Sequence, residues 1–527
     1  MTSLSHCLLS LLIWVPILGG FVTLVTNSTD KDSTPAKWVA LAFSIVTLIL
    51  CVPLYLLFDP SISGMQLTEM RRWFSLFDGT LVYYGLGVDG FSVLFIILTA
   101  FSTLVVLLAA WNTITYKTRQ YMAIFLISCG LMNGIFSATN TILFYVFWEA
   151  LLIPTVLGIG IWGGKQRAYA AVKFFMYTFL GSVFLLAAFF YLHVQVASQS
   201  VSQLISTDTF SIGNFIHWAT QNNAANITLT AQWLLLGAFF LAFAIKIPMW
   251  PFHSWLPDAH SEAPDGGSVI LAALMLKLGA YGFLRFVLPI VPSVTAVLDW
   301  LLIASSLIAI IYVGIIAMAQ TNIKRLIAYS SISHMGLVTL ALFSIFVLVR
   351  HDSYGQADAF MAVQGAMFQM IAHAFSSGGL FIAAGMLAIR MGSQRIKDFQ
   401  GVATSMPILA TFVMLFALAN VGLPGTSGFV GEFLIILSVF KYAPWVALLA
   451  GLTLVIAPGY TLWLYKRVFF GKVVSQKVSA LQDISGMEIF VLTLLAVPVI
   501  FFGLFPQTIL SVSHAASHAV VSGAAGA

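Results

Sequence analysis

Residues 232–256 have the sequence QWLLLGAFFLAFAIKIPMWPFHSWL, an apolar run of membrane-spanning length that contains one lysine and two prolines. A helix needs about 20 apolar residues to cross a bilayer, so this stretch predicts a transmembrane helix. Proline interrupts a helix and frees backbone groups, which membrane depth tolerates only beside a polar cavity. Because Lys246 stands just before Pro248, we expect a broken helix that admits water in the middle of a membrane.

The composition of the whole chain resembles that of this stretch. Of 527 residues, 60% are hydrophobic and 8% are charged, whereas soluble domains have roughly 25% charged residues. So few charges cannot cover a soluble protein of this size, and we expect an integral membrane protein. The first apolar stretch has no positively charged start and no small-residue cleavage site, so we expect it to be retained as a helix.

Apolar runs predict an all-α polytopic fold with about fourteen transmembrane helices. Their expected bounds are 7–25, 38–58, 81–111, 121–137, 139–161, 168–192, 232–256, 268–290, 296–318, 325–349, 359–390, 405–440, 445–469 and 486–510. The twelfth helix, like the seventh, is expected to be broken, here by GLPGTSG at 422–428. Two broken helices five apart in order predict two inverted repeats.

This organisation divides a single membrane domain, 1–527, into four parts. They are the N-terminal helices 1–3 (1–120), a first repeat of helices 4–8 (121–290), a second repeat of helices 9–13 (296–469) and helix 14 (486–510). Hardly any strand pattern is visible between them.

Lysine and arginine are distributed unevenly over the predicted loops. Fifteen fall in one set of alternate loops, and only Arg71, Arg72, Arg350 and Lys441 fall in the other set. Cytoplasmic loops carry the excess of positive charge. We therefore expect both termini on the periplasmic side.

Ionisable residues inside the predicted spans are the main functional signal, because a charge at bilayer depth costs several kcal/mol. The candidates are Glu149, Lys246, Lys277, His334, His373 and Glu432, with Lys173 as a weaker one. Carboxylates, amines and imidazoles connected by hydroxyl groups and water form a proton relay. Burial disfavours a charged lysine and a nearby carboxylate favours it, so moving one carboxylate can load or release a proton.

Several of these side chains have a second interpretation. Glu149 and Lys246 could form a static buried ion pair that fixes packing. Lys173 lies near a helix end, where a snorkelling side chain is as good an explanation, and for Arg285 snorkelling is the favoured one. His253 and His260, at the expected cytoplasmic mouth, serve loop packing at least as well as proton entry.

Other classes of function are disfavoured by the sequence. Cys7, Cys51 and Cys129 lie far apart without CxxC spacing, which argues against an iron–sulfur cluster, a disulfide framework or a thiolate zinc site. The sequence has neither GxGxxG after a strand nor a P-loop. The net charge of +5 reflects loop topology rather than nucleic-acid binding.

Six segments, in their order and spacing, resemble the antiporter-like subunits of respiratory complex I, the NADH:quinone oxidoreductase. They are FWEALLIP (147–154), AIKIPMWPFHSWLPDAHSEAP (244–264), LAALMLKLGAYGFLRF (271–286), AQTNIKRLIAYSSISHMG (319–336), QMIAHAFSSGGLF (369–381) and VGLPGTSGFVGEF (421–433). The resemblance extends over nearly the whole chain.

This resemblance implies a proton-translocating membrane-arm subunit in a bacterial inner membrane. Its implied roles are Glu149 as modulator of Lys246, Lys277 as central relay, His334 and His373 as links between half-channels, and Glu432 as terminal proton acceptor. It also implies that this chain holds no cofactor. FMN, the iron–sulfur clusters and the NADH and quinone chemistry would belong to partner subunits.

The family contains three antiporter-like subunits. Two of them, L and N, carry lysine where this chain has Glu432, and no long lateral helix follows residue 510 as it does in L. Both features favour the third subunit, and the implied partners are L, N, the lateral helix of L and lipids. Asp265 departs from the family, which usually has a small neutral residue there.

Two alternatives remain. One is a subunit of a multisubunit cation/proton antiporter or of a membrane-bound hydrogenase, which share this fold. The other is a purely structural membrane subunit, although the cost of its buried charges argues against that.

Overall fold

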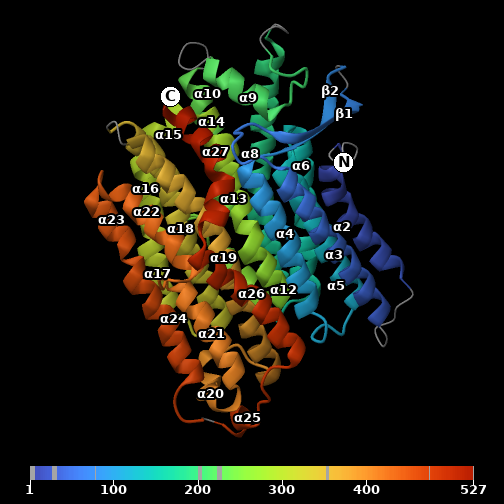
Figure 1. Cartoon of the computed structure of the whole chain (residues 1–527), viewed down its shortest axis with the longest axis vertical. Coiled ribbons are helices and arrows are strands. Elements are labelled where there is room, and N and C mark those ends of the chain that lie inside the picture. The colour runs from blue at the N-terminus through green and yellow to red at the C-terminus, as the bar shows by residue number, and fades with distance from the viewer. Residues whose placement is uncertain are drawn as a thin grey trace.

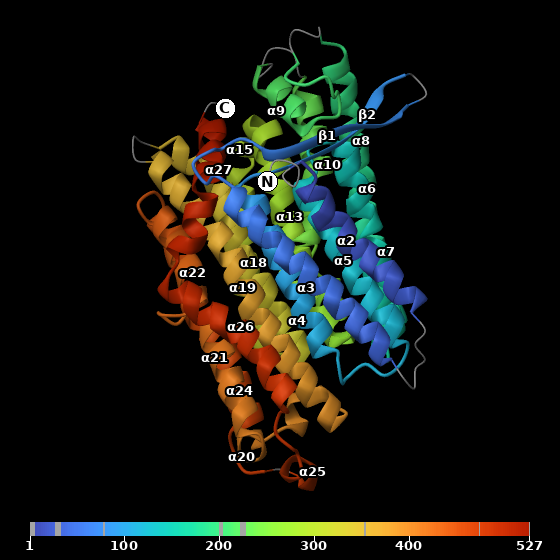
Figure 2. The same cartoon turned by 45° about the vertical axis from the view of Figure 1, so that its right-hand side comes forward.

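The computed structural model describes residues 6–26, 33–76, 79–199, 204–221, 228–351, 355–473 and 475–525. Long helices run side by side along the longest axis of the molecule, and both labelled termini lie toward the upper end (Figures 1 and 2). Thirteen helices in these residues are long and apolar enough to cross a membrane. The expected all-α polytopic membrane fold is therefore confirmed.

The N-terminal part differs from the prediction at one point. Helices α2 (Leu8–Val25) and α3 (Thr34–Leu57) are followed by an antiparallel hairpin of β1 (Gln66–Ser75) and β2 (Leu81–Val88), and then by α4 (Gly90–Ala109). The third span was expected to begin at residue 81, and strands were expected to be nearly absent. Both expectations were wrong, because LVYYGLGV is rich in β-branched and aromatic residues and pairs with β1.

The next group of helices contains the first break. It consists of α5 (Thr118–Ser137), α6 (Thr141–Ala150), α7 (Leu152–Trp162), α8 (Arg167–Ala197), α9 (Ile212–Gln221), α10 (Leu229–Lys246), α11 (Leu256–Glu262), α12 (Asp265–Ile270), the π-helical η2 (Leu271–Met275), α13 (Leu276–Gly282), the π-helical η3 (Phe283–Val287) and α14 (Leu288–Ile290). The seventh predicted span ends as α10 at Lys246 and resumes as α11. Pro248, with φ of +24°, lies between them.

The following group contains the second break. It consists of α15 (Pro292–Val297), α16 (Asp299–Ile308), the π-helical η4 (Ala309–Val313), α17 (Gly314–Met318), α18 (Ile323–Val349), α19 (Gly355–Met391), the 3₁₀ helix η5 (Ile396–Asp398), α20 (Val402–Ser405), α21 (Pro407–Asn420), α22 (Ser427–Phe440), α23 (Pro444–Gly451) and α24 (Thr453–Phe469). The twelfth predicted span is split into α21 and α22. Gly422 and Gly425, both with positive φ, turn the chain between them.

The C-terminal part contains a helix that the sequence did not predict. After α25 (Gln476–Ser479) and α26 (Gly486–Leu504), the chain continues as α27 (Gln507–Ala525), which ends at the upper end of the molecule (Figure 2). This segment is rich in Ser, Ala and His, and its weak apolar pattern hid it. Ser513 and Ser517 hold it against α19 through hydrogen bonds with Gln364.

The core of the bundle surrounds α18 and α19. The most apolar part of α19 is entirely buried, whereas about a quarter of the corresponding part of α3 or α26 is buried. Helices at the periphery therefore face lipid or other subunits, and polar residues on α18 and α19 lie deep inside the protein.

Candidate functional site

Four of the predicted residues lie in a row and form a buried chain. Nζ of Lys277 on α13 lies 2.8 Å from Nδ1 of His373 on α19. The ring centroids of His373 and His334 are 5.9 Å apart. Nδ1 of His334 on α18 is 3.0 Å from Oε1 of Glu432 on α22. Each of the four side chains is at most 2% exposed.

Lys277 is positioned by an irregular helix. The π-helical segments η2 and η3 flank the short α13 that carries it, and such segments often occur at functional sites. Nζ also donates to the carbonyl oxygen of Ala272. The Nε2 atom of His373 has no hydrogen-bond partner among the described residues. A histidine with one engaged and one free ring nitrogen can take a proton on one side and deliver it on the other.

Glu432 lies where two helices approach closely. A Cβ atom at Gly431 would meet the Cα of Gln369 at 2.7 Å, so glycine permits α22 to contact α19. The side-chain amide of Gln369 donates to Oε1 of Glu432 at 3.3 Å. The hydroxyl of Tyr460 on α24 lies 3.2 Å from Nε2 of His334. Sequence reasoning missed Tyr460, although it found the residues on either side of this cluster.

The first broken helix presents a different arrangement. Lys246 is 1% exposed in the last turn of α10, and its Nζ has no hydrogen-bond partner among the described residues. Nζ lies 3.8 Å from the ring centre of Trp148. Glu149 is only partly buried, and no ion pair within 4.0 Å joins it to Lys246 among the described residues. The two side chains therefore form no contact ion pair in this structure.

Close packing brings the two lysines near the same break. A Cβ atom at Gly279 would meet the amide nitrogen of Ile247 at 2.5 Å, so α13 lies directly against the residue that follows Lys246. Among the described residues, no hydrogen bond joins Lys246 to Lys277.

Lys173 and Tyr177 contact the segment that follows the first break. Nζ of Lys173 lies 2.7 Å from Oδ2 of Asp258 on α11, and the hydroxyl of Tyr177 is 2.8 Å from that of Ser254. Asp258 is also paired with Arg325 on α18. These contacts join α8 and α18 to the segment 254–258 after the first break, outside the buried chain of Lys277 to Glu432.

Arg285 corrects an expectation. Its side chain does not snorkel to the surface but is 13% exposed and paired with Asp89 at 2.7 Å. The hydroxyl of Tyr281 accepts hydrogen bonds from Arg285 and donates to the carbonyl of Phe136. Asp89 caps α4 at Ser92 and could not be linked to Arg285 from sequence, because 196 residues separate them.

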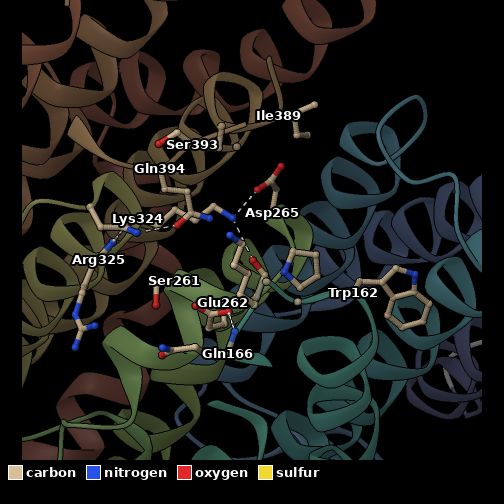
Figure 3. Close-up of a pocket in the computed structure, with 18 of the residues that line it drawn as sticks. Trp162, Gln166, Ser261, Glu262, Asp265, Lys324, Arg325, Ile389, Ser393 and Gln394 are labelled. Carbon is tan, nitrogen blue, oxygen red and sulfur yellow. Dashed lines mark hydrogen bonds and ion pairs between the residues drawn. The ribbon is translucent and has the colours of Figure 1, made fainter. Parts of the chain in front are cut away.

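A cavity of about 950 Å³ opens on the lower half of the molecule, between α11, α12, α18 and the end of α19. Figure 3 shows Lys324 and Asp265 pointing toward one another across it, with Nζ and Oδ1 2.7 Å apart. Asp265 lies against the backbone of α19, because a Cβ at Gly385 would meet its carboxyl carbon. The unusual acid therefore provides the partner of a lysine that is itself 4% exposed.

His260 lies between this cavity and the buried chain. It is fully buried and stacked on Phe381 at 4.5 Å, and neither ring nitrogen has a hydrogen-bond partner among the described residues. Lys324 and Lys277 are its two charged neighbours.

Groups that would hold a metal were not found in the part of the chain that the structure describes. No cluster of three or more His, Cys, Asp or Glu residues occurs there. The cysteines in this part are free thiols.

Comparison with known sequences identifies relatives of this chain. The family model of the NADH:quinone oxidoreductase/Mrp antiporter transmembrane region matches residues 138–457. NADH-quinone oxidoreductase subunit M of Rhodobacter capsulatus is 42% identical over 506 residues, covering 95% of this chain and 94% of that protein. NADH-ubiquinone oxidoreductase chain 4 of Arabidopsis thaliana is 35% identical, covering 96% of this chain and 95% of that protein.

Solved structures show the same fold. A chain of respiratory complex I from Thermus thermophilus superimposes with a TM-score of 0.82 at 29% identity, covering 98% of this chain and 99% of that one. A chain of the Mrp complex from Dietzia sp. reaches 0.80 at 19% identity, covering 98% and 97%, and it shows the fold alone. The chain therefore belongs to the NADH:quinone oxidoreductase/Mrp antiporter transmembrane family, among relatives that are subunit M and chain 4 of NADH:quinone oxidoreductase.

Proposed function

We propose that this chain translocates protons as a membrane-arm subunit of NADH:quinone oxidoreductase, using energy from redox reactions in other subunits. The observation that carries the proposal is the buried chain Lys277, His373, His334, Glu432, in which contacts of 2.8 and 3.0 Å flank a pair of adjacent imidazoles. Buried ionisable groups are costly and mark ion or proton pathways by default. A purely structural subunit would have no use for such an arrangement.

In the proposed route, protons enter at the cavity beside Lys324 and Asp265 and pass His260 to reach Lys277. His260 suits this step because both of its nitrogens are free for hydrogen bonds with water. From Lys277 the proton moves through His373 and His334 to Glu432, with Tyr460 and Gln369 as polar neighbours.

In this proposal, Glu149 and Lys246 control whether a proton is held on the route or released. When the carboxylate of Glu149 approaches, it favours the charged form of Lys246; when it withdraws, burial favours the neutral form and the proton leaves. The proposal is supported by the position of Lys246, whose Nζ lies over the face of Trp148 and makes no contact ion pair with the carboxylate.

The decisive experiment compares Glu432→Gln with Glu69→Gln in the assembled complex. Glu69 is also buried, but its carboxylate accepts hydrogen bonds from the backbone at Leu9 and Ser10, away from the relay. We expect Glu432→Gln to lower the number of protons pumped per NADH oxidised in proteoliposomes, with Glu432→Asp retaining more. Glu69→Gln should leave that ratio unchanged. Normal pumping by an assembled Glu432→Gln complex would remove Glu432 from the route.

A multisubunit cation/proton antiporter is the second candidate, because the Mrp complex shares the fold. The subunits that copurify decide between the two: NADH-oxidising, quinone-binding, FMN- and iron–sulfur-containing partners support the first, and only small membrane subunits the second. We further propose the antiporter-like subunits L and N and the lateral helix of L as neighbours.

We also propose a bacterial inner membrane with both termini on the periplasmic side. The orientation can be tested by labelling one position on each face. Ser200 in the predicted outer loop lies outside the described residues, and Thr207 in the same loop is exposed. Thiol labelling at Thr207→Cys from the periplasm and at Ser393→Cys from the cytoplasm would support this orientation. Labelling of both from one side would contradict it.

A further inference from the structure

A second cavity, of about 650 Å³, lies at the lower end of the molecule near the end of α24. Its lining residues are Thr321, Arg395, Ile396, Lys397, Gln400 and Arg467. Three of them are cations and none is an acid. The cavity therefore has a concentrated positive field, unlike the larger cavity of Figure 3, where lysine and aspartate face one another.

The cations of this cavity lack the partners that other cations of the protein have. Elsewhere, arginines pair with carboxylates, for example Arg325 with Asp258 and Arg390 with Glu488. Among the described residues, no carboxylate lies within 4.0 Å of any of the three cavity cations. The carboxylate of Asp398, the adjacent acid, accepts a hydrogen bond from Ser393.

Arg467 has the clearest unused binding capacity. Its Nε and one terminal nitrogen are buried without a hydrogen-bond partner among the described residues. Buried donors are normally satisfied, and a guanidinium presents them in a planar fork that fits a phosphate. An anionic ligand with several acceptor oxygens would satisfy them.

The position of Arg467 indicates where this ligand comes from. Its guanidinium lies over the ring of Trp463 at 4.6 Å, and Trp463 is 47% exposed. The apolar span Pro444–Phe469 ends two residues later, and Phe470 is 53% exposed. Exposed aromatic residues at the end of a span occupy the headgroup level of a bilayer. Arg467 therefore joins the basic cavity to a neighbouring surface that would face acyl chains.

We propose that this cavity binds the phosphate-bearing headgroup of an anionic phospholipid. Arg467 contacts the phosphate through its free fork, and Lys397 and Arg395 add point charges at the rim. The acyl chains lie along the exposed apolar residues of α24, which include Leu462 and Val455. Basic pockets of this kind on membrane proteins bind anionic headgroups, and the adjoining apolar surface favours a lipid over free phosphate.

The experiment uses the purified whole complex in nanodiscs that contain a photoactivatable phosphatidylglycerol analogue. We expect mass spectrometry to find the label in peptides that include 395–400 and 463–470. Each cation near the surface contributes about 1 kcal/mol, which is about fivefold in affinity. Arg467→Gln and Lys397→Gln should therefore each weaken retention of the analogue about fivefold.

The matched control is Lys466→Gln, which removes the same charge from the neighbouring exposed residue outside the cavity. It should leave labelling at these peptides unchanged, and unchanged NADH oxidation by all variants would show intact assembly. Equal labelling of Arg467→Gln and wild type would overturn the proposal. Equal labelling by a phosphatidylcholine analogue would also overturn it, and so would displacement of the phosphatidylglycerol analogue by millimolar inorganic phosphate. A cross-link from position 397 to an acidic segment of another subunit, in place of lipid, would have the same consequence.

Discussion

The two broken helices place an acid and a base in very different surroundings. At the second break, His334 and Glu432 lie 3.0 Å apart, and both are almost completely buried. At the first break, Lys246 lies on Trp148, while Glu149 is partly exposed and not in contact with it. A contact pair passes a proton directly, whereas a separated pair acts through its field. In the proposed function, the second site therefore serves proton transfer and the first site serves control.

The order of acid and base along the sequence is also reversed between the two sites. The acid precedes the base in the first pair, Glu149 and Lys246, and follows it in the second, His334 and Glu432. The predicted inverted repeat would place each pair beside its own break. Both breaks exist, whereas the repeat itself stays a prediction.

The largest effects should come from the contact pair. His334→Gln and Glu432→Gln should each lower proton pumping tenfold or more, about 1.4 kcal/mol or greater. The double variant should be hardly worse than either single one, because groups that act as a unit are not additive. Pumping rates of the four complexes, compared at equal amounts of assembled complex, measure this coupling. If the effects of the two substitutions multiplied in the double variant, His334 and Glu432 would act independently, and the contrast between the two breaks would not hold.

The separated pair should show smaller and more adjustable effects. We expect Glu149→Ala and Lys246→Ala to lower pumping and the coupled electron transfer several-fold, with Glu149→Asp milder. Moving the acid one turn, as Tyr145→Glu in the Glu149→Ala background, should restore part of the rate because only proximity matters. The move to Ile153 should fail, since that side chain is 64% exposed and faces outward. Pumping by Glu149→Ala at the wild-type rate would make the pair structural.

The cavity pair of Asp265 and Lys324 provides an intermediate test of proton entry. Asp265→Asn would leave Lys324 buried with a weaker partner, at a cost of about 1–3 kcal/mol in the free energy of unfolding. Because a Cβ at Gly385 would collide with Asp265, Gly385→Ala should produce a similar loss. Thermal unfolding and pumping rates should fall together in both variants. If Asp265→Asn unfolded and pumped like the wild type, the pair would contribute neither to stability nor to proton entry.

The smallest effect on pumping is expected in the segment between α8 and α9, which belongs to neither pair, and here the prediction concerns local stability. Burial raises the pKa of Asp208 to about 6, although Asn140 and the amide of Phe210 donate hydrogen bonds to it. In the unfolded chain the carboxyl has its ordinary pKa of 3.8. The stabilising contribution is therefore complete below pH 3.8 and is lost as pH rises toward 6.

The expected loss is about 3 kcal/mol at most, from about 1.4 kcal/mol for each pKa unit. Hydrogen exchange of residues 204–221, corrected for intrinsic rates, should show more opening at pH 7 than at pH 4.5. Asp208→Asn should remove this dependence. The same pH dependence in Asp208→Asn would assign it to another group.

Sequence alone determined the membrane fold, the two breaks and the residues of the candidate relay. These follow from local signals: the length of apolar runs, proline and glycine inside them, and ionisable residues at bilayer depth. Burying an ionisable residue costs free energy whatever its neighbours are, so its position in an apolar run is informative by itself. β1 was missed because its apolar pattern is weak, β2 because its apolar residues run on into those of α4, and α27 because it is rich in Ser, Ala and His.

Only the tertiary structure decided which of these residues touch. Lys277 meets His373 across 96 positions, and Arg285 meets Asp89 across 196. Tyr460 contacts His334 from α24, and Lys246 lies over the indole of Trp148 rather than in contact with Glu149. Distances between side chains on different helices depend on how the helices pack, and packing depends on the shapes of all neighbours together. Residue type and position therefore indicate that a charge is functional, while packing determines its partner.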